Sequence, residues 1–299
     1  AAVKIAILAA GAAGMYCGSC MRDNTLAAAL RRSGYQVTLV PLYTPLRTDE
    51  TDVSIDQVFY GGINVYLQHA SKVFRHTPRF VDWLLDRRWL LNAAGKKGTS
   101  TDPAKLGPLT VSTLRGEHGP QRKELTRLVR FLADYVQPEI VTLPNAMFIG
   151  AADTLRRELG AAVVCELTGE DIFIDQLPDG HRAEAMQIMR DCCEQIDRFV
   201  ASSRYYADHM ADYFAVDREL IDVVYPGVAA ADFTPASNRP ADRLPTVGYL
   251  ARICAEKGFD RLIEAMVKLR ARPGMERVNL RSAGWLGAGS HGRRSPATG

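Results

Sequence analysis

Near the start of the chain, residues 4–18 read KIAILAAGAAGMYCG. The apolar part of this stretch, residues 5–10, predicts a buried strand, and the glycines after it predict a tight turn. A helix is expected over about 23–32, with Gly34 as its C-terminal stop, and the apolar run 36–40 predicts a second strand. This order of strand, turn, helix and strand is typical of a parallel sheet with helical crossovers.

Short apolar runs continue to alternate with helical periodicity along the chain. Strands are expected at 139–143, 162–165 and 199–202, and again, after a break, at 246–250 and 279–284. Between the last two, apolar residues recur at helical spacing over 259–269. The pattern predicts an α/β protein built from doubly wound, Rossmann-type units.

The break between Ala229 and Pro245 is rich in Ala, Pro, Asp and Asn, which is typical of a linker. We therefore expect a first domain over 1–225, a linker over 226–245 and the start of a second domain over 246–286. Two strands and one helix bury little apolar surface, so the second domain is expected to be incomplete. The last residues, 287–299, lack periodicity and are expected to form a disordered tail.

Composition excludes several classes of protein. With 47% hydrophobic and 24% charged residues the chain has the composition of an ordinary globular protein. Its net charge of +3 is too small to indicate a nucleic-acid-binding surface. Six cysteines without a secretory signal favour a reduced, cytoplasmic setting. No run of about 18 apolar residues occurs, so membrane association would be peripheral.

The glycine-rich turn after the first strand is the first candidate site. Gly14 and Gly18 allow the backbone to approach a ligand, and the amides that open the next helix favour a phosphate. The turn is not GxGxxG, and Pro41-Leu42-Tyr43 stands where a dinucleotide-binding domain places its acidic residue, which disfavours a nicotinamide cofactor. The alternative is a tight turn that only packs strand on helix.

The same turn contains Cys17-Gly18-Ser19-Cys20, a CxxC motif near a helix N-terminus. This spacing is that of a dithiol redox site, while two small thiols packed in a tight loop are the alternative. A zinc site would need two further ligands, and the chain has no second CxxC and no HxxxH, so no metal site is predicted.

The second candidate site follows the strand at 246–250. Arg252 and Lys257 lie five residues apart in a loop, and Gly258 frees the start of the next helix. Two such cations suit a diphosphate whose charge builds up as a leaving group departs. A solvated loop, in which Glu256 pairs with one of the cations, is the alternative.

An ordered series of motifs then gives a resemblance that covers about residues 3–287. The series resembles the GT-B family of retaining glycosyltransferases often called group 1, relatives of the glycogen and starch synthases. The motifs of this series, in chain order, are Gly14–Cys20 with Arg22-Asp23-Asn24, Gly34–Leu39, Phe59–Leu67, Val200–Ser203, Val223–Val228, Asp232–Pro235 and the Arg252-x(4)-Lys257-Gly258 loop.

The resemblance implies two Rossmann-type domains that face each other across a cleft. The amino domain would receive a glycan or other acceptor, and the carboxyl domain would hold a nucleotide sugar such as a UDP-, GDP- or ADP-sugar, without a cofactor or an obligatory metal. Transfer would retain the anomeric configuration. Arg252 and Lys257 would act in catalysis by neutralising the departing diphosphate, and backbone donors near Gly14 and Gly18 would approach the phosphates from the opposite wall.

The chain departs from the family pattern at three places. Leu167-Thr168-Gly169-Glu170-Asp171 replaces the usual His-Gly, which makes Thr168, Gly169, Glu170 and Asp171 the acceptor-side candidates. Pro226-Gly227 lacks an intervening Asn, and residues 285–299 contain no Glu to supply the family's Glu-x(7)-Glu motif. Two alternatives to an active transferase therefore stay open: an inactive fragment that acts as a binding module, and a CxxC thiol-redox protein.

Overall fold

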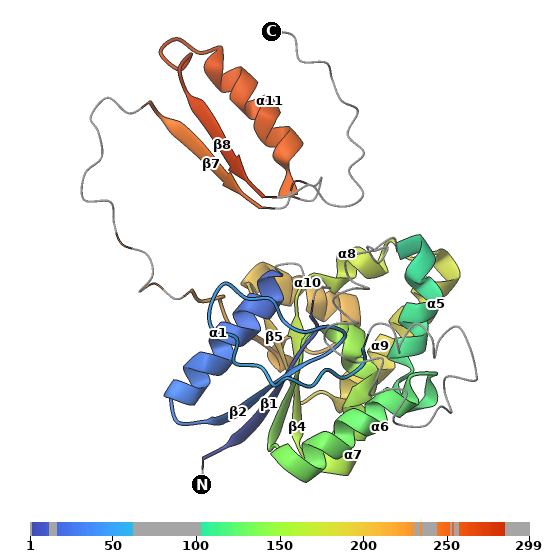
Figure 1. Ribbon diagram of the computed structural model, residues 1–299. Helices are drawn as coiled ribbons and strands as arrows, with labels where there is room; N and C mark the ends of the chain where they lie inside the picture. Colours follow the sequence, from blue (N-terminus) through green and yellow to red (C-terminus); the bar gives the residue numbers. More distant parts are fainter. Residues whose placement is uncertain are drawn as a thin grey trace. The chain divides into compact units, whose positions relative to one another are not determined.

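The structure is a computed structural model that describes residues 2–11, 17–61, 103–228, 230, 234, 244–251, 253 and 257–284. The chain divides into two compact units, Ala1–Ala229 and Ala230–Gly299. Figure 1 shows the strands and helices of both units. Each unit is described by itself.

A six-stranded sheet forms the centre of the first unit. Its order is β2-β1-β3-β4-β5-β6, and every neighbouring pair is parallel. The strands are β1 (Lys4–Ala9), β2 (Gln36–Pro41), β3 (Ile140–Leu143), β4 (Ala162–Leu167), β5 (Arg198–Ala201) and β6 (Ile221–Val223). The chain runs from β1 outward to β2 and then returns to β3 on the other side of β1, so the strand order reverses between β1 and β3. In open α/β sheets ligands bind at such a switch point, beside the carboxyl ends of the strands.

Helices of the first unit connect successive strands. They are α1 (Gly18–Arg32), α5 (Pro103–Leu114), α6 (Arg122–Phe131), α7 (Ala152–Leu159), α8 (Glu170–Ile174), α9 (Asp179–Cys192) and α10 (Arg204–Phe214). Short 3-10 segments lie at Gly116–His118, Ala146–Ala151, Cys193–Gln195 and Arg218–Leu220, and a π segment extends α6 over Leu132–Val136. None of the helices among the described residues is both long and apolar enough to cross a membrane.

Two apolar cores lie on the two faces of the sheet, and β1 contributes to both. Ile5 and Ile7 belong to the smaller core with Ala27 of α1, whereas Ala6 and Leu8 belong to the larger core. The larger core also contains the buried side chains of α6, α7, α9 and α10. Because both faces are covered, the inner strands carry almost continuous apolar runs rather than an alternating pattern.

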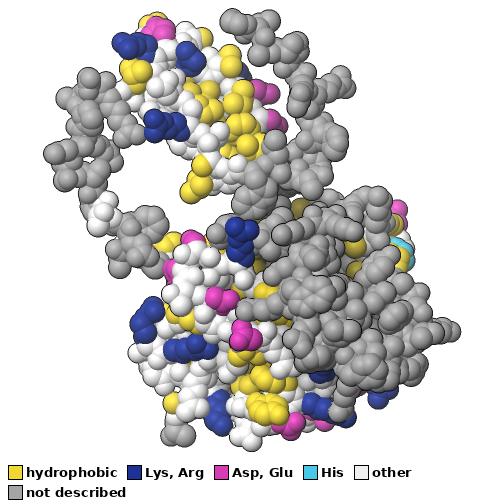
Figure 2. Space-filling model, in the orientation of Figure 1, with side chains coloured by type: hydrophobic (Ala, Val, Ile, Leu, Met, Phe, Trp, Pro, Cys, Tyr) yellow, Lys and Arg dark blue, Asp and Glu magenta, His cyan; other side chains and the backbone are white. Residues whose placement is uncertain are grey.

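The second unit contains one β-α-β element among its described residues. Strands β7 (Thr246–Leu250) and β8 (Asn279–Ala283) pair in parallel, and α11 (Phe259–Arg270) connects them. Met266 of α11 is buried, while Ile263 and Val267 are exposed at 41% and 67%. Figure 2 shows hydrophobic side chains at the surface of this unit.

The fold class expected from the sequence is confirmed, and each strand expected after residue 139 is present within two residues of its predicted ends. The first helix begins at Gly18 rather than near residue 23, and the segment that precedes α7 is a 3-10 helix. The sequence analysis did not predict α5 or α8. The expected tail at 287–299, and the motif Phe59–Leu67 beyond Gly61, lie outside the described residues.

Candidate functional site

The switch point places the end of β1 and the start of α1 at the carboxyl edge of the sheet. Gly11, just after β1, has a φ of +78°, and a Cβ there would lie 2.5 Å from the backbone oxygen of Thr44. Only glycine fits this position, because it lacks a Cβ and tolerates a positive φ. Gly14 lies outside the described residues. Gly18 is exposed, and a Cβ there would meet nothing within 4 Å, so its side of α1 is open to a ligand.

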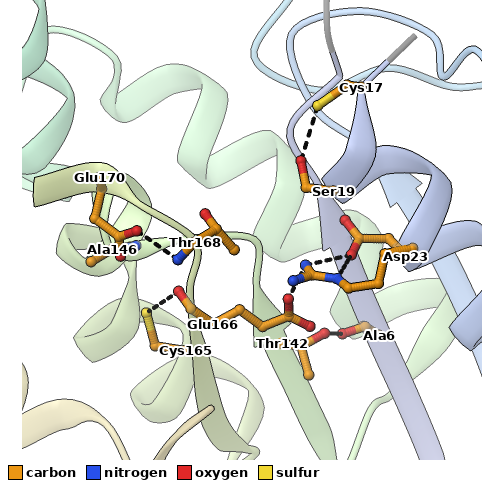
Figure 3. A network of polar contacts seen from close by, with 11 residues as sticks. Ala6, Cys17, Ser19, Asp23, Thr142, Ala146, Cys165, Glu166, Thr168 and Glu170 are labelled. Atoms are coloured by element: carbon orange, nitrogen blue, oxygen red, sulfur yellow. Dashed lines mark hydrogen bonds and ion pairs between the residues drawn. The ribbon is translucent and has the colours of Figure 1, made fainter. Parts of the chain in front are cut away.

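A buried charge network links α1 to β4 (Figure 3). The Arg22 guanidinium donates to Asp23 Oδ1 from Nη2 at 2.7 Å and from Nε at 3.1 Å, and it also pairs with the carboxylate of Glu166. Asp23 is only 1% exposed and Glu166 only 8%. Two carboxylates thus share one guanidinium at the carboxyl edge of the sheet.

Burial disturbs the titration of Asp23. Loss of solvent raises the pKa of Asp23 to about 6, against the opposing attraction of Arg22. Its second carboxylate oxygen, Oδ2, is buried and has no hydrogen-bond partner within the described part of the chain. A buried acceptor without a partner is costly when charged, which is consistent with the raised pKa.

Asn24, the third residue of the Arg22-Asp23-Asn24 motif, has a structural role. It is buried, its Nδ2 donates to the Thr51 carbonyl at 2.9 Å, and its Oδ1 accepts from the Val53 amide at 2.9 Å. These two bonds attach the segment after β2 to α1. Arg22 and Asp23 are therefore the members of the motif that face the network.

The four acceptor-side candidates lie in the turn between β4 and α8. Glu170 is buried, and its carboxylate accepts from the Thr168 amide at 2.7 Å and the Ala146 amide at 3.1 Å. Burial raises the pKa of Glu170, and these amides oppose the shift. Glu170 thus secures the turn rather than facing solvent. Thr168 is exposed, so its hydroxyl is the group of this turn that an acceptor can reach.

Asp171 and Gly169 are held by α10. Tyr206 donates its hydroxyl to Asp171 Oδ1 at 2.6 Å, and the same hydroxyl accepts from the Gly169 amide at 2.9 Å. Asp171 Oδ2 also lies 3.1 Å from Nε2 of His209. Gly169 has a φ of 102°, in the left-handed region that favours glycine. The structure thus brings the candidates together in one hydrogen-bonded turn.

The CxxC motif forms the N-terminus of α1. Cys17 is the N-cap residue, and its sulfur lies 3.0 Å from the Ser19 hydroxyl. Hydrogen bonding from Cys20 and Ser19 lowers the pKa of the Cys17 thiol to about 5. Cys20 is buried, and its hydrogen bond to Cys17 together with burial raises the pKa of its thiol.

In the second unit the structure places only part of the predicted cation pair. Lys257 is exposed just before Gly258, which is the N-cap residue of α11 and has a φ of +65°. Tyr249 donates its hydroxyl to the Lys257 carbonyl at 3.5 Å, which connects the loop to β7. Arg252 lies outside the described residues, so its relation to Lys257 stays a prediction.

Sequence reasoning missed several polar residues of the first unit, among them Glu166, Tyr206 and His209. One signal was available for Glu166, because it is the only charged residue in the apolar run of β4. No comparable signal marks Tyr206 or His209, since their partners lie on α8. Within the described ranges, no group of three or more His, Cys, Asp or Glu side chains could hold a metal ion.

Comparison with known proteins finds no family model that matches the chain. Among curated proteins, the D-inositol 3-phosphate glycosyltransferase of Segniliparus rotundus is 33% identical over 106 residues, which cover 32% of this chain and 23% of that protein. The match thus spans less than a quarter of that protein.

Solved structures match most of the chain. The sucrose-phosphate synthase of Thermosynechococcus elongatus matches with a TM-score of 0.56 and 14% identity, over 94% of this chain and 62% of its own. Anabaena HepE in complex with UDP and glucose matches with a TM-score of 0.54 and 13% identity, over 96% of this chain and 62% of its own. The catalytic domain of Arabidopsis thaliana starch synthase IV, bound to ADP and acarbose, matches with a TM-score of 0.52 and 12% identity, over 94% of this chain and 69% of its own.

The chain has the GT-B glycosyltransferase fold. The expected resemblance is thereby confirmed. In the GT-B fold described here, the Arg22 network and the turn at Thr168–Asp171 both lie at the carboxyl edge of the first sheet.

Proposed function

We propose that this chain belongs to a glycosyltransferase that moves a sugar from a nucleotide-activated donor to an acceptor with retention of configuration. The acceptor class is a glycan or another hydroxyl-bearing molecule. The GT-B fold and the sequence match to a glycosyltransferase support the reaction class. Five described cysteines are free thiols, which suits a reducing compartment such as the cytoplasm.

One observation carries the proposal further than the fold does. The Arg22–Asp23–Glu166 network lies at the carboxyl edge of the sheet, beside the switch point, where open α/β sheets bind their ligands. The Arg22 side chain is 24% exposed while both carboxylates are buried, so its guanidinium is the group of the network that can donate a hydrogen bond to a sugar hydroxyl.

The remaining roles are those that the resemblance to the GT-B family implies. Thr168 supplies an exposed hydroxyl to the acceptor, while Glu170 and Asp171 hold the turn that presents it. Arg252 and Lys257 of the second unit neutralise the nucleoside diphosphate, and backbone donors near Gly14 and Gly18 approach the phosphates. No cofactor takes part in this scheme.

Calorimetry with UDP, GDP and ADP tests the donor assignment. Arg252→Ala combined with Lys257→Ala is expected to weaken binding of the preferred diphosphate about a hundredfold or more, since each of the two charged contacts contributes about 1.5–3 kcal/mol. Lys268→Ala combined with Arg270→Ala, which removes two charges from the last turn of α11, serves as the matched control. Equal affinity of the native chain and the Arg252→Ala, Lys257→Ala variant would show that these residues do not bind the donor.

A binding module without turnover is the second candidate, and the exposed Ile263 and Val267 of α11 favour it. Exposed apolar side chains on one helix are suited to contact with another protein surface. Transfer assays over several nucleotide sugars separate the two candidates. Turnover above the rate in buffer supports the transferase, while diphosphate binding without turnover supports the module.

A further inference from the structure

Cys17 and Cys20 are arranged asymmetrically at the start of α1. Cys17 is half-buried and can be reached from solvent, whereas Cys20 is 1% exposed and lies one turn further into the helix. Cys17 is the N-cap residue of α1 and Cys20 is the third residue of the helix, a spacing that places the two side chains on the same side of the first turn. A reachable thiol thus stands beside a second thiol that solvent cannot reach.

The surroundings of Cys17 favour a negative sulfur. The hydroxyl of Ser19 lies 3.0 Å from its sulfur, and interactions with Cys20 and Ser19 lower the pKa of the Cys17 thiol. The positive end of the α1 dipole lies at the same place. A thiolate is the form of cysteine that attacks disulfides, so Cys17 is prepared for exchange while still in the folded state.

The other described cysteines lack these features. Cys165 is fully buried, and burial raises the pKa of its thiol well above the usual range. Cys192 and Cys193 are adjacent at the end of α9, and burial raises the pKa of each. Within the described residues, Cys17 is the cysteine whose surroundings stabilise the thiolate.

We propose that Cys17 and Cys20 form a redox-active dithiol that closes to a disulfide by exchange with a small-molecule disulfide such as oxidised glutathione. The proposal rests on the geometry of the CxxC motif, and its test does not require glycosyl transfer. It assigns Cys17 as the attacking sulfur and Cys20 as the resolving sulfur.

The exchange takes two steps. The Cys17 thiolate attacks one sulfur of oxidised glutathione, whose S–S bond breaks to release one glutathione thiolate and leave a mixed disulfide. Cys20 then loses its proton to solvent and attacks the Cys17 sulfur, which displaces the second glutathione. Two protein thiols are oxidised by two electrons, and one glutathione disulfide is reduced to two thiols.

The second step is assisted by the first. In the reduced state the hydrogen bond to Cys17 is the largest cause that raises the pKa of Cys20, and the charge of Cys17 adds to it. Once Cys17 is in a mixed disulfide, its sulfur is no longer a thiolate and both effects disappear. Cys20 then ionises more readily at the moment at which it must attack.

Peptide mapping of the full 299-residue chain tests the proposal. The protein is equilibrated with mixtures of reduced and oxidised glutathione, quenched with acid and alkylated. We expect a Cys17–Cys20 disulfide to form as the oxidised fraction rises, while Cys165 and Cys193 remain as alkylated thiols. Cys20→Ser is expected to trap glutathione on Cys17, and Cys17→Ser to abolish both products.

Cys192→Ser is the control, because it removes a half-buried thiol outside the motif and leaves the exchange unchanged. Ser is an effective N-cap residue, so Cys17→Ser retains α1, which circular dichroism verifies. Absence of the Cys17–Cys20 disulfide from the native chain in excess oxidised glutathione would overturn the proposal. So would a Cys20→Ser chain that captures glutathione on Cys17 no faster than on Cys192.

The pH dependence of alkylation gives an independent readout on the native chain. Near pH 5.5, Cys17 is expected to react with iodoacetamide about tenfold faster than Cys192, because its thiolate fraction far exceeds that of an ordinary thiol even after allowance for its weaker nucleophilicity. A rate for Cys17 that rises only above pH 8 would contradict the assigned attacking role.

Discussion

Arg22 of α1 is paired with Glu166 at the end of β4 and with its own neighbour Asp23, so one guanidinium holds two buried carboxylates at the carboxyl edge of the sheet. Helix α1 follows β1, and β1 is separated from β4 in the sheet by β3. The Arg22–Glu166 pair therefore connects elements on either side of β3. When both carboxylates are ionised they carry two negative charges, and Arg22 compensates one of them.

Loss of Arg22 should destabilise the first unit. Arg22→Met leaves Asp23 and Glu166 buried without their cation, which is expected to cost about 3 kcal/mol in the free energy of unfolding at pH 7. Denaturant unfolding measures the change. Arg32→Met at the exposed end of α1 is the control and is expected to change stability by less than about 0.5 kcal/mol.

A double variant tests whether the loss comes from the uncompensated charge. In the Arg22→Met background, Glu166→Gln should be less destabilising than in the native chain, because it then removes a charge that has lost its partner. Equal effects of Glu166→Gln in both backgrounds would contradict the pairing.

The titration of Asp23 should appear in the pH dependence of stability. Its pKa is about 6 in the folded chain and near its ordinary value of 3.8 when unfolded. Between these values the folded state binds more protons than the unfolded state, so the unfolding free energy falls as pH rises from about 4 to 6. A shift of this size corresponds to about 3 kcal/mol across the window. Comparison of Asp23→Asn with the native chain, by denaturant unfolding at several pH values, isolates this contribution.

In that comparison the stability of Asp23→Asn relative to the native chain should increase from pH 4 to pH 6 and stay constant above pH 7. A constant difference over the whole range would mean that Asp23 titrates normally. Asp134, an exposed carboxylate of the π segment, provides the control as Asp134→Asn.

The predictable part of this molecule is the part that depends on local patterns. Strands β3, β4 and β5 were predicted because buried parallel strands carry apolar runs. Helix α5 contains Gly107 and Pro108, which weaken its helical pattern, and α8 has only five residues. Neither could be predicted from periodicity, because contacts with the rest of the fold stabilise them.

The candidate site also has a predictable and an unpredictable part. Glycines such as Gly11 indicated the loop after β1, because a backbone conformation or close approach that only glycine allows leaves a glycine in the sequence. The pairing of Arg22 with Glu166 was not predictable, because it depends on the order of strands in the sheet. Likewise, Asp171 was a candidate for acceptor contact, but its hydrogen bonds to α10 exist only in the folded unit.

The Tyr206 hydroxyl should stabilise the turn that carries Thr168. Tyr206→Phe removes a donor to Asp171 and an acceptor for the Gly169 amide, so we expect a loss of about 1–2 kcal/mol in unfolding free energy. Hydrogen exchange at the Gly169 amide should accelerate as well. Tyr205→Phe is the matched control, since Tyr205 is 79% exposed on the same helix, and it should change neither quantity. An unaltered exchange rate at Gly169 in Tyr206→Phe would refute this role.

Two glycines at the carboxyl edge of the sheet should respond in opposite ways to the same substitution. Gly11→Ala places a Cβ 2.5 Å from the Thr44 backbone oxygen in a residue with a positive φ, so the backbone must shift. We expect a loss of about 2 kcal/mol or more in the free energy of unfolding. Gly18→Ala meets open space at the first residue of α1, where alanine lowers the entropy of the unfolded chain, and should be neutral or stabilising by up to about 1 kcal/mol. Thermal and denaturant unfolding of the two variants, side by side, measures both effects. Equal destabilisation by the two substitutions would show that the close approach of Gly11 to Thr44 does not constrain the loop after β1.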